Sequence, residues 1–196
     1  MPLRFRAASV SPAPTASSFI VKLPTVTVAV VGPVPDSTTV VKLNPVQPDG
    51  GGIVAKLGVF TSMRAAGVDG VLRYTTFEAF PMAPDDAARA LGAFPEVADL
   101  SKPLLAQLSA GERQIVIEGL AARIIVGDAR KTLPDWDGMA DAWFLDGFSP
   151  AKNPELWGDD LMMQVARHTA PGGTFATYSA AGFARRSLAN AGFIVT

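Results

Sequence analysis

From residue 71 to the end of the chain, short apolar runs alternate with runs of helical character. The apolar runs are rich in β-branched and aromatic residues, and several of the helical runs begin at a proline or end at a glycine. Strands that alternate with helices form a parallel sheet with helices packed on its faces. This alternation therefore predicts the α/β fold class, and no other feature of the sequence constrains the fold as much.

The pattern gives approximate bounds for each element. The predicted strands cover residues 71–80, 114–120, 122–129, 140–147 and 173–179, and another strand begins at residue 193. The predicted helices cover residues 84–94, 96–108, 154–170 and 180–192. In a parallel sheet of this kind, ligands bind beyond the carboxyl ends of the strands.

The first part of the chain has a different composition. Residues 1–50 are rich in proline, valine and threonine, with strand-like runs at 19–31 and 37–43. Because proline cannot donate a backbone hydrogen bond, we expect such strands to lie at sheet edges. We interpret residues 1–50 as a segment of unknown role and residues 51–196 as one domain.

Composition excludes several kinds of site. The formal net charge is -1, so no global field attracts the chain to nucleic acid, and any RNA-binding surface must be local. The chain has no cysteine and one histidine, which excludes disulfides, thiolate sites and multi-histidine metal sites; no metal is expected. No apolar run is long enough to span a membrane, and we expect a cytoplasmic protein without a membrane partner.

Three of the predicted strands end in an acid. Glu78, Asp128 and Asp146 follow the runs near residues 71, 122 and 140. A carboxylate just past a strand can accept hydrogen bonds from a ribose diol or an exocyclic amine. The alternative interpretation is that each acid caps a helix or lies in a solvated turn. Because all three acids fall at strand ends, we expect them to converge at one edge of the sheet.

The motifs around these acids resemble a known family. "FEAFPM", "GDARKTLP", "DAWFLDGFSPAKNPELW" and "PGGTFATYSAAGFARRSL" are similar to the methyltransferase domain of the tRNA wobble-uridine modification protein MnmC, from about residue 68 to the end. The resemblance implies a class I S-adenosylmethionine methyltransferase with a Rossmann-like sheet, and leaves open whether that sheet is complete at both ends. It implies methyl transfer from S-adenosylmethionine to 5-aminomethyl-(2-thio)uridine at the tRNA wobble position.

The resemblance also implies roles for individual residues. Asp146 is the expected catalytic residue, and the expected substrate and tRNA contacts are Phe148, Lys152, Arg185 and Arg186. The expected cofactor contacts are Gly58, Glu78, Gly127, Asp128, Ala129 and Asp146. For the arginines and Lys152, a solvated surface is the alternative interpretation. FAD is not expected, because the family's oxidase domain has no counterpart here; a separate FAD-dependent oxidase of the same pathway is a candidate partner.

The sequence departs from the family at one place. Where the family has a glycine-rich turn of the form E-x-G-F-G-T-G, this chain reads "IVAKLGVFTSMRAAG", in which Gly58, Phe60 and Thr61 are the similar positions. Such a turn needs glycines so that the backbone can approach the cofactor. The sequence therefore predicts weak or absent cofactor binding.

Two other functions stay open at this point. One is a non-catalytic or truncated methyltransferase-like remnant that has lost cofactor binding. The other is a dinucleotide-dependent oxidoreductase, against which the absence of a G-x-G-x-x-G motif speaks. Titration with S-adenosylmethionine and with NAD separates these functions.

Overall fold

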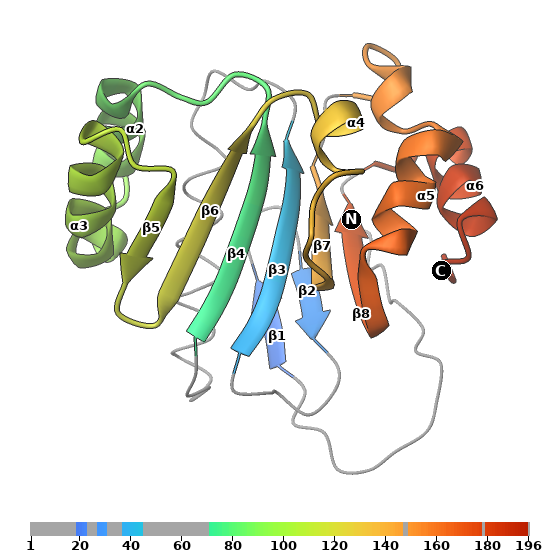
Figure 1. The fold of residues 1–196 in the computed structure, drawn as a ribbon, viewed down its shortest axis with the longest axis horizontal. Helices are drawn as coiled ribbons and strands as arrows, with labels where there is room; N and C mark the ends of the chain where they lie inside the picture. The colour runs from blue at the N-terminus through green and yellow to red at the C-terminus, as the bar shows by residue number, and fades with distance from the viewer. Residues whose placement is uncertain are drawn as a thin grey trace.

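The main feature of the fold is a six-stranded sheet. The structure, a computed structural model, describes residues 19–22, 27–30, 37–44, 71–146, 149–177 and 179–195. The strand order is β5-β6-β4-β3-β7-β8 (Figure 1). The parallel strands are β6 (Leu120–Val126), β4 (Val71–Glu78), β3 (Ser37–Asn44), β7 (Ala140–Leu145) and β8 (Thr169–Thr177). The predicted α/β class is confirmed.

Two pairs of strands are antiparallel. β5 (Gln114–Ile117) pairs antiparallel with β6 and forms one edge of the large sheet. β1 (Phe19–Lys22) and β2 (Thr27–Val30) pair with each other in a separate two-stranded sheet, and β2 lies next to β8.

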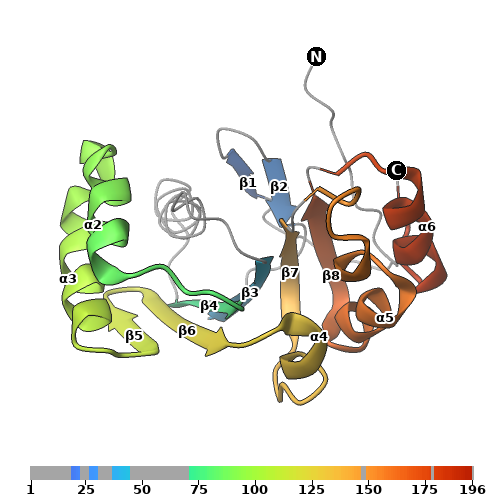
Figure 2. The ribbon, with the colours of Figure 1, turned by 90° about the horizontal axis from the view of Figure 1, so that it is seen from above.

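The helices lie in two groups on opposite faces of the sheet (Figure 2). On one face are α2 (Pro84–Gly92) and α3 (Ala98–Ser109), joined by the 3-10 turn η1 (Pro95–Val97). On the other face are α4 (Ala129–Thr132), α5 (Asp159–Arg167) and α6 (Gly182–Asn190), with the 3-10 turn η2 (Pro154–Leu156) before α5.

Each face of the sheet has its own hydrophobic core. On β7, Ala142 and Phe144 pack in the core with α2 and α3, and Trp143 and Leu145 pack in the core with α5 and α6. A strand buried on both faces reads as a continuous apolar run, which explains the sequence "AWFL". β7 is therefore central, and its carboxyl end is a position where a side chain can reach a ligand.

The position of β3 corrects an expectation from the sequence. Residues 37–44 lie between β4 and β7 at the centre of the sheet and not at an edge. Residues 37–44 contain no proline, so no backbone donor is missing within the strand. The sheet thus includes a strand from the N-terminal side of the domain boundary expected at residue 50.

Three bounds near the C-terminus also differ from the sequence prediction. The helix predicted over 154–170 is interrupted because Trp157 is buried and Gly158 is extended, so α5 begins at Asp159. β8 begins at Thr169 and includes Pro171 and Gly172, next to an irregular pairing with β7. Such an irregularity tolerates proline within a strand. Residues 193–195 form no strand, contrary to the prediction.

The outer edge of β5 is closed by a side chain. The Gln107 amide donates to the Val116 carbonyl at 3.0 Å and accepts from the Val116 backbone N–H at 3.1 Å. An unpaired edge strand is a template for pairing with another chain. The glutamine of α3 thus satisfies both backbone groups of Val116 at this edge.

Replacing Gln107 with alanine should destabilise this edge. Loss of two hydrogen bonds at an exposed site is expected to lower the free energy of unfolding by about 1–2 kcal/mol. We also expect greater self-association, measured by analytical ultracentrifugation at increasing concentration. The control is Gln114→Ala, whose side chain is exposed on β5. Gln164→Ala on α5 is unsuitable because that side chain is partly buried. Equal self-association of both variants would contradict an edge-protecting role.

Candidate functional site

The candidate site lies at the carboxyl edge of the parallel strands. Glu78 is the last residue of β4, and its position in the pairing register matches Asn44 of β3 and Val126 of β6. Asp146 follows the last residue of β7 directly and is half-buried. The acids at the ends of β4 and β7 are therefore separated by the single strand β3.

Glu78 is held in a defined position. Its side chain is 8% exposed, and the Thr76 hydroxyl donates to Oε1 at 2.7 Å. Its backbone carbonyl accepts from the N–H of Gly127 at 2.9 Å, which joins the ends of β4 and β6. A buried carboxylate fixed in this way is suited to accept hydrogen bonds from neutral donors such as hydroxyl groups.

Glu78 and Asp146 act on the same buried side chain. Tyr74 lies four residues before Glu78 on the same face of β4 and is 1% exposed. Burial, and then the negative charges of Glu78 and Asp146, raise the pKa of the Tyr74 hydroxyl well above its ordinary value. Both carboxylates thus lie within electrostatic reach of one phenol on the α2/α3 side of the sheet. The predicted convergence is supported for this pair.

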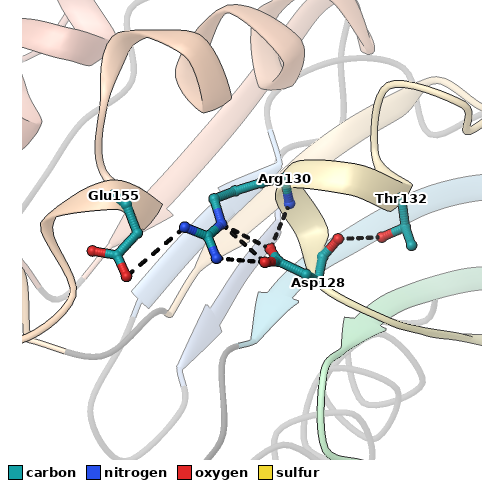
Figure 3. A network of polar contacts seen from close by, with 4 residues as sticks. All are labelled: Asp128, Arg130, Thr132 and Glu155. Atoms are coloured by element: carbon teal, nitrogen blue, oxygen red, sulfur yellow. Dashed lines mark hydrogen bonds and ion pairs between the residues drawn. The ribbon is translucent and has the colours of Figure 1, made fainter.

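Asp128 has a different environment, shown in Figure 3. Its side chain caps α4 by accepting from the Arg130 backbone N–H at 3.0 Å. Arg130 Nε lies 3.0 Å from both carboxylate oxygens, and Nη2 forms an ion pair with Oδ2. Hydrogen bonding to Arg130 is the main cause that lowers the pKa of Asp128. The helix-capping interpretation is therefore what the geometry shows for this acid.

The residues beside Asp128 shape the β6–α4 corner. Gly127 has φ +141°, and a Cβ added to it would lie 2.7 Å from Thr132 Cγ2. A residue with a side chain is disfavoured there on both grounds. Ala129 is buried in the core with α5 and α6, so only its backbone can face a ligand at this edge.

The expected substrate contacts are only partly placed. Lys152 is exposed in the loop after β7, where its N–H and that of Asn153 donate to the Ser149 carbonyl at 2.8 Å and 3.1 Å. Arg185 is half-buried and Arg186 exposed in the first turns of α6, which follows the carboxyl end of β8. Gly58 and Phe148 lie outside the described residues.

Arg130 is the main site residue that sequence reasoning missed. It contacts the two carboxylates of Asp128 and Glu155, the second at 3.9 Å. A basic residue two positions after an acid that caps a helix is the signal that could have identified it. Thr76 could also have been identified, because side chains two positions apart on a strand lie on the same face, which places Thr76 beside Glu78.

The Asp128–Arg130 pair predicts a pH-dependent stability. Because the folded-state pKa of Asp128 is lower than its unfolded value near about 3.9, its contribution is fully present above that value and is lost as pH falls through the folded pKa. Asp128→Asn should therefore be less stable than wild type at pH 7, and the difference should shrink between about pH 5 and pH 2. Urea unfolding at successive pH values measures this. Arg130→Gln should show the same convergence, and a constant difference would contradict the assignment.

Two other features are absent from the described residues. Among residues 71–146, 149–177 and 179–195, no group of three histidine or acidic side chains is arranged to hold a metal ion. Within the described part of the chain, no helix has the length and apolar character needed to cross a membrane.

Comparison with known proteins gives a consistent result. A family model described as S-adenosyl-L-methionine-dependent methyltransferase matches residues 95–196. The chain is 45% identical over 132 residues to the tRNA 5-methylaminomethyl-2-thiouridine biosynthesis bifunctional protein MnmC of Ectopseudomonas mendocina, covering 65% of this chain and 20% of the relative. The protein of the same name from Chromobacterium violaceum is 44% identical over 129 residues, covering 63% of this chain and 20% of the relative.

A solved structure has the same fold. The crystal structure of MNMC2 from Aquifex aeolicus matches with a TM-score of 0.57 and 23% identity, covering 82% of this chain and 48% of that chain. This likeness extends the resemblance to the spatial arrangement of the strands. The chain spans about a fifth of the length of the curated relatives it matches.

Proposed function

The chain belongs to the S-adenosyl-L-methionine-dependent methyltransferase family, and we propose that it methylates the aminomethyl group of 5-aminomethyl-(2-thio)uridine at the tRNA wobble position. The observation that carries the proposal is the pair of carboxylates, Glu78 and Asp146, at the ends of β4 and β7 on one side of the sheet. The printed names of the MnmC relatives supply the substrate class. Family membership also disfavours the oxidoreductase and remnant alternatives.

The residues at the sheet edge fit the proposed cofactor. Glu78, fixed by Thr76, offers carboxylate oxygens to ribose hydroxyls. Gly127 has a positive φ and no side chain, so its backbone can come close to the cofactor. The Asp128 carboxylate and the Ala129 backbone are assigned to the adenine side. Because Arg130 already donates to both oxygens of Asp128, an adenine amine would share this carboxylate with Arg130.

Asp146 is the proposed catalytic residue. S-adenosylmethionine supplies an electrophilic methyl group on a sulfonium. The nucleophile is the substrate's primary amine, which must be neutral to have a lone pair. Asp146 orients this amine by accepting a hydrogen bond from one of its N–H groups. As the N–C bond forms, the S–C bond of the sulfonium breaks, S-adenosylhomocysteine leaves, and Asp146 takes the proton that the amine loses. Phe148 is assigned to stack on the uridine, and Lys152, Arg185 and Arg186 to contact tRNA phosphates.

The wider setting is part of the same proposal. A cysteine-free chain suits a reducing cytoplasm, where we place the reaction. The partner is tRNA, and a separate FAD-dependent oxidase is the proposed source of the aminomethyl substrate. This chain itself is proposed to need neither FAD nor a metal.

Direct titration tests the proposal. Purified chain should bind S-adenosylmethionine and not NAD in calorimetry, and should transfer a labelled methyl group to tRNA that carries 5-aminomethyluridine. The turn that differs from the family lies in residues 45–70, outside the described part, and the sequence predicts that it weakens binding. A dissociation constant in the low micromolar range would show that the altered turn is tolerated. Binding of NAD alone, or methylation of unmodified tRNA at an equal rate, would overturn the proposal.

Glu78→Gln should weaken cofactor binding while leaving the fold intact. Hydrogen bonds to a charged group contribute about 1.5–3 kcal/mol, so the dissociation constant for S-adenosylmethionine should rise about 10- to 150-fold. Glu118→Gln, exposed in the turn between β5 and β6, is the matched control and should bind as wild type does. Unchanged affinity of Glu78→Gln would remove this residue from the cofactor site.

A further inference from the structure

The strongest unassigned feature is a polar chain that joins two segments of the site edge. Arg130 donates to Asp128 through its backbone N–H and through two guanidinium nitrogens, and its third nitrogen, Nη1, lies 3.9 Å from Glu155 Oε1 (Figure 3). Asp128 lies between β6 and α4 and caps α4. Glu155 lies in η2, in the segment between β7 and α5. One side chain thus contacts both segments.

Only arginine can make this set of contacts. A guanidinium presents donors in a planar fork, so Nε and Nη2 can serve one carboxylate while Nη1 faces another. A lysine ammonium is a single point charge on a flexible stem and cannot span the two acids in this manner. The positive charge also separates two carboxylates that would otherwise repel each other, and both acids raise the pKa of Arg130.

Glu155 lies between the site and a fixed anchor. On its C-terminal side, Trp157 is 1% exposed and packs in the core with α5 and α6, and its backbone N–H donates to the Pro154 carbonyl at 3.0 Å. On its N-terminal side, the turn at Ser149 leads back to Asp146. Trp157 fixes one end of this segment, so the contact of Glu155 with Arg130 constrains residues 149–156.

We propose that Arg130 is a positioning residue that couples the corner after β6 to the segment after Asp146, so that a change at the Asp128 carboxylate alters the order of residues 149–156. The inference rests on the proposed function, in which Asp128 lies on the cofactor side and residues 149–156 on the tRNA side. Cofactor binding at Asp128 then orders the segment that meets the substrate.

Amide hydrogen exchange of the full chain without ligand tests the coupling. Arg130→Gln and Glu155→Gln should each accelerate exchange at Lys152 and Asn153 about two- to fivefold, the range expected for an exposed ion pair. Asp128→Asn keeps a capping side chain and touches no residue of η2, yet it should accelerate the same amides. Arg89→Gln, which removes an exposed ion pair with Asp86 on α2, is the matched control and should leave them unchanged.

The decisive comparison is a double variant. Asp128→Asn should accelerate exchange in the presence of Arg130 and have no further effect in the Arg130→Gln background. Arg130→Lys, which keeps the charge without the fork, should fall between wild type and Arg130→Gln. An Asp128→Asn variant with wild-type exchange at Lys152 and Asn153, or an equal effect in both backgrounds, would overturn the coupling.

A ligand arm separates this inference from the proposed function. S-adenosylhomocysteine should slow exchange at Lys152 and Asn153 in wild type and in Arg89→Gln, and should not do so in Arg130→Gln even at saturation. Protection that persists in Arg130→Gln would overturn the coupling. If wild type does not bind S-adenosylhomocysteine, the proposed function fails, and the ligand-free comparison still decides whether Arg130 couples the two segments.

Discussion

Replacing Asp146 with asparagine is expected to lower the rate constant for methyl transfer by about 10²- to 10⁴-fold, the range for loss of a positioned proton acceptor. Asparagine keeps the size of the side chain and removes its charge. The residue follows the last paired residue of β7 and is half-buried, so its replacement should leave the sheet intact. Rapid-quench measurement with tRNA that carries 5-aminomethyluridine gives the rate.

Asp146→Glu separates two roles for this carboxylate. Glutamate keeps the basic group but displaces it by about one methylene, and misplacement of about 1 Å can cost about 10²-fold when orientation dominates. A large loss in both Asp146→Asn and Asp146→Glu therefore indicates that Asp146 mainly orients the amine. Asp160→Asn, an exposed acid in the first turn of α5, is the control and should keep full activity. Full activity of Asp146→Asn would remove Asp146 from the reacting centre, and loss of folding would assign it a structural role.

The positions of the three acids were predictable because they depend on topology. Parallel strands place their carboxyl ends at one edge, so an acid after each apolar run was enough to locate Glu78 and Asp146. The environment of Asp128 was less predictable. Whether a carboxylate at that position faces a ligand or caps the next helix depends on local dihedral angles and on the side chain two residues later, here Arg130.

The position of β3 shows a different limit of sequence reasoning. The proline content of the N-terminal residues suggested an edge strand, but β3 itself contains no proline and lies between two strands. Strand order is set by contacts between segments far apart in the sequence, and composition carries no information about them. The interruption before α5 has a similar cause. Burial of Trp157 in the core fixes the chain direction there, although the local sequence has helical character.

The centrality of β7 leads to the largest expected effect on stability. Trp143 is fully buried, and its indole N–H donates to the Thr169 hydroxyl at 2.9 Å, which in turn donates to the Val165 carbonyl at 2.7 Å. Its ring meets that of Trp136 edge-to-face at 6.0 Å. One side chain thus joins β7, β8, α5 and the segment after α4.

Trp143→Ala is expected to lower the free energy of unfolding by about 3–5 kcal/mol through loss of buried area and creation of a cavity. Since domains of this size are stabilised by only about 5–15 kcal/mol, this one change removes a large fraction of the total. Trp143→Phe retains much of the buried ring and removes the indole donor, so a loss of about 1–2 kcal/mol is expected. Met163→Ala, exposed on α5, is the control and should stay within about 0.5 kcal/mol of wild type.

Urea unfolding followed by circular dichroism measures all three variants. A loss below about 1 kcal/mol for Trp143→Ala would mean that the site is not a filled core position. Asp146 would then lack the rigid strand that its proposed role in catalysis requires.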